Sequence, residues 1–405
     1  MSDRQRFGPS QRSAIDPFIV MEMMAAANAR AATGADVLHL EVGEPCGGAT
    51  AGAIAAATAA MARSSCGYTE AFGLPALRHR IGHYYRDTYG VAVDSHHVAM
   101  TVGASGAFIL AFLAAFEAGD RVIVTEPGYP AYRNILHSLG IEVVAVPTDA
   151  RTRFQPTPAL LDRVEGPIHG LILASPSNPA GTMLARADLQ RLAAYCAGRG
   201  IRIGSDEIYH GITYDEPAET ILAFCRDAIV VNSFSKYFCM TGWRLGWLVL
   251  PSDLVPAVTR LGQNLFIAAP TVAQHAALGA MGDLAELDRR IERYRRNRAH
   301  LLAALPKVGL TRMAPADGAF YLYLDVAAFT DDSVELCRRL LHDTGVALTP
   351  GVDFDPARGH HFVRMSFAGA EADVAEACNR LCVWFSATQA LKPGLKVPQL
   401  AAAGA

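Results

Sequence analysis

Five short apolar runs of the sequence are each followed directly by side chains that could do chemistry. The runs occupy 98–101, 122–124, 171–174, 201–203 and 229–231. The residues after them supply hydroxyl groups, an aromatic ring, an amide, carboxylates and a lysine. In an open parallel sheet, ligands bind outside the carboxyl ends of the strands. We therefore expect these side chains to meet at one edge of such a sheet.

One set of these residues is suited to hold a phosphate group. Three of its members open an apolar helix, where free backbone N–H groups and the helix dipole favour an anion. The other three add two hydroxyl groups and a guanidinium for charge-assisted hydrogen bonds. The set consists of Ala104, Ser105, Gly106, Ser233, Ser235 and Arg244.

A second set is suited to hold a pyridine ring and to activate a bound substrate. Tyr129 could lie flat on the ring, and Asn178 and Tyr209 could hydrogen-bond its phenolic oxygen. Asp206 would keep the ring nitrogen protonated, which makes the ring an electron sink. Lys236 would form a Schiff base with the cofactor and then move the substrate proton. Together the two sets resemble a site for pyridoxal 5'-phosphate.

Each of these residues also has an ordinary structural interpretation when it is taken alone. A Ser-x-Ser-Lys segment is common in surface loops, and an Asp-Glu pair after a strand is commonly a cap. Asn178 before a proline is typical of a turn, and Tyr129 could be a half-buried packing residue. The order and spacing of the whole set therefore carry the prediction.

The alternation of elements predicts an α/β fold. Apolar β-branched runs, including one at 247–250, alternate with helical stretches, which is typical of a mostly parallel sheet covered on both faces. A long charged helix begins near Asp283 and would connect this part to a smaller region with strand candidates at 319–324 and 362–367. The predicted boundaries are 48–290 for a large cofactor-binding domain, 14–47 with 291–390 for a small domain, and 1–13 with 391–405 for loosely ordered arms.

The composition argues against several classes of partner and compartment. The 36 Lys and Arg residues against 39 Asp and Glu residues lack the basic excess that a nucleic-acid binder needs. No apolar run approaches the roughly 20 residues that cross a bilayer. The charged, polar N-terminus does not look like a secretory signal, so we expect a cytoplasmic protein. Eight scattered cysteines favour reduced thiols, and the adjacent histidine pairs at 96–97 and 360–361 lack the i,i+4 spacing of a helical metal site.

The chain resembles the class I/II aminotransferases over nearly its full length, from about Ser13 to Ser386. The resemblance rests on several motifs in a fixed order, which together are highly specific. These motifs are EVGEP at 41–45, GYTEAFGLPALR at 67–78, PGY at 127–129, SPSNPAGT at 175–182, SDEIY at 205–209, SFSK at 233–236, GWRLG at 242–246 and VRMSF at 363–367.

This resemblance implies a fold, a reaction and further site residues. The implied fold is that of the fold-type-I pyridoxal-phosphate enzymes, a mostly parallel seven-stranded sheet flanked by helices plus a smaller α+β domain. The implied reaction is a ping-pong transamination between an L-amino acid and a 2-oxo acid, in a homodimer with shared active sites. Tyr68 would reach the cofactor phosphate of the partner subunit. Gly43 and Arg364 would hold the substrate carboxylate, with Tyr129 and Asn178 also contacting the substrate; the planar fork of arginine suits a carboxylate.

Other functions compete with transamination. A Cβ–S lyase, a racemase or a decarboxylating acyltransferase would use the same fold and cofactor and differ in which bond breaks. A transcription regulator would need a DNA-binding head before Gly43, where no such pattern occurs, and a serine hydrolase would need a G-x-S-x-G elbow, which is absent around Ser105 and Ser235. The glycine-rich loop at 46–50 departs from the family pattern, so aromatic, aliphatic and acidic substrates all stay open.

Overall fold

The computed structural model describes residues 8–63 and 66–390. Contacts divide the chain into two compact units. Within the described residues, the first unit comprises 8–18, Glu44–Glu292 and Pro315–Ala319, and the second comprises Ile19–Gly43, Arg293–Ala314 and 320–390. The domain boundaries drawn from the sequence stay a prediction. Of the predicted loose arms, 1–7 and 391–405 lie outside the described residues, while the N-terminal arm also includes a short 3-10 helix at Gln11–Ser13.

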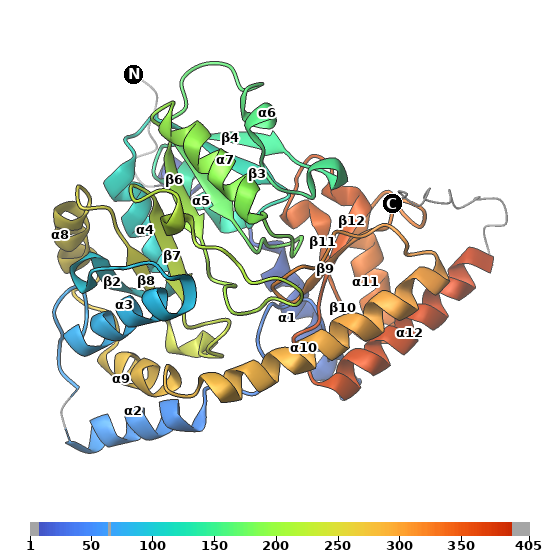
Figure 1. The fold of residues 1–405 in the computed structure, drawn as a ribbon. Coiled ribbons are helices and arrows are strands. Elements are labelled where there is room, and N and C mark those ends of the chain that lie inside the picture. Colours follow the sequence, from blue (N-terminus) through green and yellow to red (C-terminus); the bar gives the residue numbers. More distant parts are fainter. Residues whose placement is uncertain (1–7, 64–65, 391–405) are drawn as a thin grey trace. The chain divides into compact units, whose positions relative to one another are not determined.

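The first unit is built on a seven-stranded sheet (Figure 1), with the strand order β2-β8-β7-β6-β5-β3-β4. Its strands are β2 (Val98–Val102), β3 (Arg121–Glu126), β4 (Glu142–Pro147), β5 (Gly170–Ala174), β6 (Arg202–Asp206), β7 (Ile229–Ser233) and β8 (Leu245–Val249). Only β8 runs antiparallel to its neighbours, so the predicted mostly parallel sheet is confirmed. The sequence-based prediction missed β4, although residues 143–146 form a continuous apolar run, Val-Val-Ala-Val.

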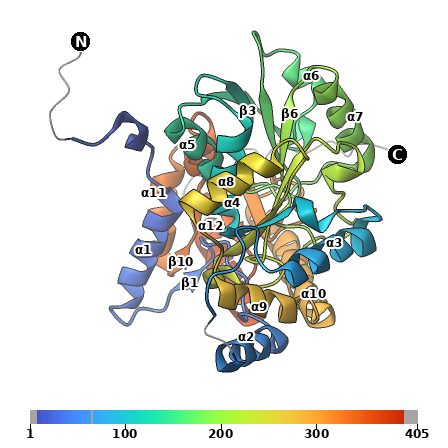
Figure 2. The same cartoon turned by 90° about the vertical axis from the view of Figure 1, so that its left-hand side faces the viewer.

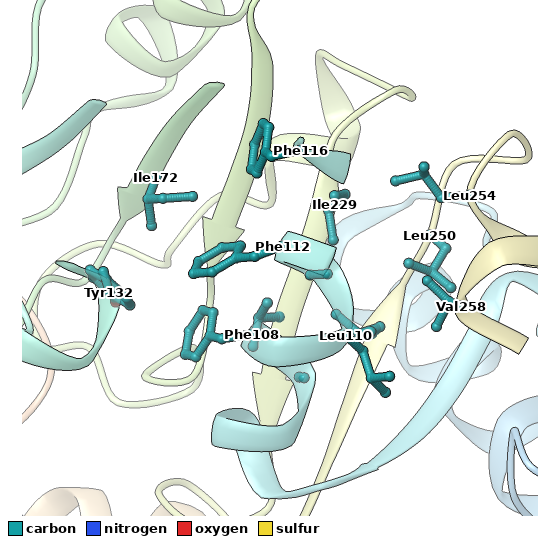
Figure 3. Packing of buried hydrophobic residues seen from close by; sticks show 14 of the residues in the cluster. Phe108, Leu110, Phe112, Phe116, Tyr132, Ile172, Ile229, Leu250, Leu254 and Val258 are labelled. Carbon is teal, nitrogen blue, oxygen red and sulfur yellow. The ribbon is translucent and has the colours of Figure 1, made fainter. Parts of the chain in front are cut away.

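Helices cover both faces of this sheet. The helices of this unit are α2 (Ala51–Arg63), α3 (Pro75–Tyr89), α4 (Gly103–Ala115), α5 (Pro130–Ser138), α6 (Pro158–Leu161), α7 (Arg186–Ala197), α8 (Val255–Leu265) and α9 (Thr271–Ala280). Neighbouring residues of a strand point to opposite faces. In β8, Leu248 belongs to the same buried cluster as Phe108 and Phe112 of α4, two residues labelled in Figure 3, whereas the Trp247 indole donates to the Tyr85 hydroxyl of α3. The prediction of helices on both faces is therefore confirmed.

Helices α2 and α9 lie side by side at the edge of the first unit (Figure 2). Their approach requires glycine, because a Cβ added at Gly279 would overlap the carbonyl oxygen of Gly52. The same Gly52 donates its backbone N–H to Asp283 Oδ2 at 2.9 Å. Helix α9 also anchors one of the loops discussed below.

The long charged helix predicted from Asp283 onward is α10 (Leu284–Ala304). The boundary between the two units falls within it, between Glu292 and Arg293. Its buried side chains include Leu287, Ile291 and Leu301, which follow the apolar spacing read from the sequence. Some of its charged residues form ion pairs, such as Arg290 with Glu286, as expected for a partly solvated helix.

The second unit combines helices with two small sheets, as an α+β arrangement. Strands β9 (Tyr321–Asp325), β11 (Thr349–Pro350) and β12 (Phe362–Ser366) form an antiparallel sheet in the order β11-β12-β9, and β1 (Leu38–His39) pairs in parallel with β10 (Val346–Ala347). The helices are α1 (Ile19–Ala31), α11 (Ser333–Thr344) and α12 (Glu371–Ala390). Asp332 caps α11 by accepting from two backbone N–H groups, and Gly345 ends it in the left-handed region.

Three general properties follow from the described part of the chain. All eight cysteines lie within it, and none of them forms a disulfide bond. Within residues 8–63 and 66–390, no helix combines the length and apolarity that a membrane crossing needs. In the same residues, no three His, Cys, Asp or Glu side chains are grouped so that they could hold a metal ion.

Candidate active site

Three parallel strands end side by side at one edge of the seven-stranded sheet. Pairing sets Ala174 of β5 opposite Asp206 of β6, and β6 pairs in turn with β7. The segments that leave these strands carry Asn178, Tyr209 and Lys236. Asn178 and Tyr209 are buried, while Lys236 is partly exposed. The topology therefore places the segments that carry three of the predicted site residues side by side at one edge of the sheet.

Asp206 is a buried carboxylate with defined partners. It is 3% exposed, its Oδ2 accepts a hydrogen bond from the Tyr132 hydroxyl, and its Oδ1 accepts from the Ile208 N–H at 3.0 Å. Burial raises the pKa of Asp206 to about 6, although the hydrogen bonds from Tyr132 and Ile208 and the charge of Lys236 act in the opposite direction. A further cation placed against this carboxyl would favour its charged form.

The amine and the aromatic rings of the site are held by neighbouring side chains. Lys236 Nζ lies 6.0 Å from the centre of the Tyr209 ring. Tyr129 stands at the N-terminal end of α5, where its ring meets Tyr132 edge to face, with centroids 5.4 Å apart, and meets Phe18 at 5.8 Å. These two perpendicular contacts fix the plane of the Tyr129 ring.

The N-terminal end of α4 forms a cradle with β8 and Arg244. A Cβ added at Gly246 would lie 2.8 to 3.0 Å from backbone atoms of Asn232, Gly103 and Ala104, so the two backbones touch there. Gly103 has a φ of +65°, and a Cβ at this position would lie 2.5 Å from Arg244 Nη2. The guanidinium therefore lies against the start of the helix. Helix N–H groups beside a guanidinium are the donors that a phosphate prefers.

The small and hydroxyl residues predicted for this cradle occupy the expected elements. Residues 104–106 form the first turn of α4. Ser233 ends β7, where its hydroxyl donates to the Leu245 carbonyl at 3.3 Å and accepts from the Ser235 N–H at 3.0 Å. Ser233 thus orders the turn that precedes Lys236. A direct contact of either serine with a phosphate stays a prediction.

Tyr68 projects from a loop that is anchored on both sides. It is 85% exposed. The Thr271 hydroxyl donates to the Gly67 carbonyl at 2.6 Å, and Gln274 Nε2 donates to the Thr69 hydroxyl at 3.2 Å. Both anchors come from α9, so the backbone beside the exposed ring is held in place.

The predicted carboxylate-binding residues of the second unit lie together. Arg364 on β12 is 3% exposed, and its Nη2 donates to the Glu41 carbonyl. Its guanidinium carbon lies 4.4 Å from the centre of the Tyr321 ring and 4.7 Å from that of Phe354, so the guanidinium contacts both rings. A Cβ added at Gly43 would overlap the Tyr321 hydroxyl. Position 43 must therefore be glycine, because the Tyr321 ring that contacts Arg364 leaves no room for a side chain there.

The sequence-based prediction missed several residues of these sites. Tyr132 stands three positions after Tyr129 on one helix, a spacing that places both on one face and could have identified it. Gln274 gave no signal in the sequence, yet it is fully buried and also accepts from the Leu74 N–H at 2.7 Å. Tyr321 and Phe354 could not be linked to Arg364 without the fold.

Comparisons with known proteins agree with this arrangement. The family model described as aminotransferase class I and II matches residues 35–381. The valine–pyruvate aminotransferase of Mycobacterium tuberculosis is 47% identical over 377 residues, which is 92% of this chain and 97% of that protein. A crystal structure of an aminotransferase from Mycobacterium tuberculosis has a TM-score of 0.92 and 45% identity, covering 94% of this chain and 100% of that one. The aspartate aminotransferase from Thermus thermophilus, solved with maleate, has a TM-score of 0.87 and 30% identity, covering 93% and 99%.

Proposed function

The chain belongs to the class I and II aminotransferases, enzymes that move an amino group between an amino acid and a 2-oxo acid, and we propose that it does so with pyridoxal 5'-phosphate in a ping-pong reaction. The observation that carries the proposal is the buried Asp206 carboxyl, close enough to Lys236 to respond to its charge, at the edge where β5, β6 and β7 end. A lysine beside a buried carboxyl is the pair that this cofactor needs.

The residues present fit the cofactor at three points. The donor set at the start of α4, with Arg244 against Gly103, fits a phosphate. The buried Asp206 fits a protonated ring nitrogen, because a cation there offsets the burial that raises its pKa. Tyr209 and Asn178 fit the phenolic oxygen. When bound, the cofactor supplies an electron sink for the substrate Cα.

Different side chains at this edge of the sheet would have different roles in catalysis. Tyr132 donates to Asp206 and so favours its charged form, which holds the ring nitrogen protonated. Lys236 would anchor the cofactor and, once released, take the proton from the substrate Cα as a base. Tyr129, with its plane fixed by Tyr132, would orient the ring. Each of these roles is part of the proposal.

In the second unit, Arg364 would bind the α-carboxylate of both substrates. Its planar fork suits two parallel hydrogen bonds to a carboxylate. The Tyr321 and Phe354 rings limit the motion of the guanidinium, so less side-chain freedom is lost when a substrate binds. Gly43 would add a backbone contact to the same carboxylate.

We further propose that the enzyme is a homodimer in which Tyr68 of one subunit reaches the other subunit's phosphate. The exposed Tyr68 ring on an anchored loop supports this arrangement. Exposed apolar side chains of the same unit, namely Ile54, Met61, Leu265 and Ile267, suit a protein contact. Sedimentation of the holoenzyme tests the dimer. The variant Tyr68→Phe should bind the cofactor more weakly while staying a dimer. The cytoplasmic location stays a prediction.

The similarity to the valine–pyruvate enzyme leads us to propose an aliphatic amino donor and pyruvate as acceptor. The test is steady-state formation of alanine from pyruvate with L-valine, L-aspartate, L-phenylalanine or L-arginine as donor. We expect the highest kcat/KM with valine and no turnover in Lys236→Ala. Turnover in Lys236→Ala would overturn the mechanism, and a preference for aspartate would overturn the substrate assignment. Ammonia release from a cysteine conjugate without an oxo acid would favour the lyase instead.

A further inference from the structure

A second buried carboxyl, Glu207, follows Asp206 directly and has no role in the reaction described above. It is 1% exposed, and its own backbone N–H donates to the Val231 carbonyl at 2.8 Å. Its Oε1 accepts three hydrogen bonds, from the Ser205 hydroxyl at 3.2 Å, the Thr220 hydroxyl at 3.0 Å and the Ile221 N–H at 2.9 Å. Oε1 of this carboxyl is therefore fully hydrogen-bonded.

The imidazole of His210 lies beside Glu207 and has a defined tautomer. Its Nε2 is 2.9 Å from the Ser175 carbonyl oxygen, which can only accept, so Nε2 carries the hydrogen. Its Nδ1 is 2.9 Å from the Tyr89 hydroxyl, which therefore donates to the ring. Burial lowers the pKa of His210 to about 4, so the ring is neutral at physiological pH. It thus joins α3 to the segment after β5.

The other oxygen of Glu207 faces this neutral ring. Oε2 lies 3.6 Å from His210 Nδ1, and within the described residues it accepts no hydrogen bond. An ionised carboxylate would leave this charged oxygen buried without a hydrogen-bond donor, next to the His210 nitrogen whose lone pair already accepts from Tyr89. Burial raises the pKa of Glu207 itself to about 8. A protonated Oε2 removes this conflict.

We propose that Glu207 carries a proton on Oε2 and that the uncharged Glu207–His210 pair is a positioning unit for the cofactor-binding edge. Tyr209 lies between the two members of the pair, and His210 bonds the carbonyl of Ser175, three residues before Asn178. The pair thus ties the turn that follows Asp206 to the segment that carries Asn178. It also leaves Asp206 as the charged carboxyl of the two. The positioning part rests on the proposed cofactor site, whereas the protonation does not.

Infrared spectroscopy of the protein without cofactor tests the protonation. The wild type at neutral pH should show a C=O stretching band of a protonated carboxyl that Glu207→Gln lacks. The matched control is Asp353→Asn in the second unit, because Asp353 is a buried carboxyl whose oxygens accept from the Ile19 and Val20 N–H groups at 3.2 Å, which favours its charged form. Asp353→Asn should remove no such band. A wild-type spectrum identical to that of Glu207→Gln in this region would overturn the proposal.

Cofactor affinity tests the positioning role in parallel, by titration of pyridoxal phosphate into the purified dimer. Glu207→Gln keeps a neutral group of the same shape whose oxygen can accept from the Ser205, Thr220 and Ile221 donors, so its Kd should stay within about threefold of the wild type, whereas Glu207→Ala should raise Kd about tenfold or more. His210→Phe should raise Kd similarly, and Tyr89→Phe, which removes only the bond on the far side of the ring, should change it much less.

The two proposals fail in distinguishable ways. If the wild type binds pyridoxal phosphate and transaminates but Glu207→Gln binds it as weakly as Glu207→Ala, the charge of Glu207 is needed and the inference is wrong while the function stands. If the wild type binds no cofactor, the proposed function and the positioning role fall together. The infrared result decides the protonation state in either case.

Discussion

Replacing Tyr132 with phenylalanine should move the pH dependence of cofactor binding. The Tyr132 hydroxyl is one of two hydrogen-bond donors to the Asp206 carboxyl, and it lowers the pKa that burial raises to about 6. Phenylalanine keeps the ring that packs against Phe108 and Tyr129 and removes the hydroxyl alone. The change therefore isolates one hydrogen bond to a buried charge.

The size of the effect follows from the strength of that bond. A hydrogen bond to a buried charged group contributes about 1.5 to 3 kcal/mol, which corresponds to a rise in pKa of about 1 to 2. In Tyr132→Phe the Asp206 carboxyl of the cofactor-free enzyme should thus titrate near or above neutral pH. Binding of a protonated ring nitrogen needs the charged carboxylate. Affinity is therefore lost as the pH falls through the pKa of Asp206, and the loss should begin at a higher pH in the variant.

The assay is the Kd for pyridoxal phosphate measured from pH 5 to pH 9 in both proteins. The matched control is Tyr195→Phe, which removes a tyrosine hydroxyl bonded to the exposed carboxylate of Asp162 at 2.8 Å. We expect the midpoint of the affinity loss to move upward in Tyr132→Phe and to stay in place in Tyr195→Phe. An unchanged midpoint in Tyr132→Phe would refute the assignment of Asp206 as the partner of the ring nitrogen.

Three further changes have calculable outcomes. In Gly43→Ala the new Cβ would lie 2.7 Å from Cζ of the buried Tyr321 ring, and we expect a loss of about 1 to 3 kcal/mol in urea unfolding. Arg364→Lys cannot form two parallel hydrogen bonds to the substrate carboxylate. In steady-state kinetics the KM for the amino acid should therefore rise about tenfold or more, with kcat changed less. The native pKa of Glu207, about 8, exceeds its unfolded value of 4.5, so the native state binds the extra proton between these values. Wild-type stability should therefore fall relative to Glu207→Gln as pH rises from about 4.5 to 8, by an amount on the order of 4 kcal/mol; the opposite effect of His210 is common to both proteins and cancels.

The strands and the order of the site segments could be predicted because each carries a local signal. Runs such as 171–174 and 229–231 are apolar and β-branched, since they are buried on both faces of a parallel sheet. Strand β4 was missed although residues 143–146 are a continuous apolar run, Val-Val-Ala-Val; in the fold it lies at the edge of the sheet, where only one of its six residues is buried. An apolar run therefore indicates a strand without showing whether both of its faces are buried.

The partners of the site residues could not be predicted, because they come from distant parts of the chain. Tyr132 and Asp206 are separated by 74 positions, and Tyr89 and His210 by 121. No pattern within either segment indicates that the two meet. The SDEIY motif pointed to Asp206 and Tyr209, but the neutral state of the neighbouring Glu207 depends on the burial that only the folded chain provides.

The central claim is that Lys236 and Asp206 form a pyridoxal-phosphate site that transfers amino groups. The most direct measurement is the visible absorption spectrum of the enzyme with pyridoxal phosphate, before and after L-valine is added without any oxo acid. The account predicts a band of lysine-bound cofactor in the wild type, absent from Lys236→Ala, that converts to the amino form of the cofactor with valine and returns with pyruvate. The same band in Lys236→Ala, or a wild-type band that no amino acid converts, would contradict it.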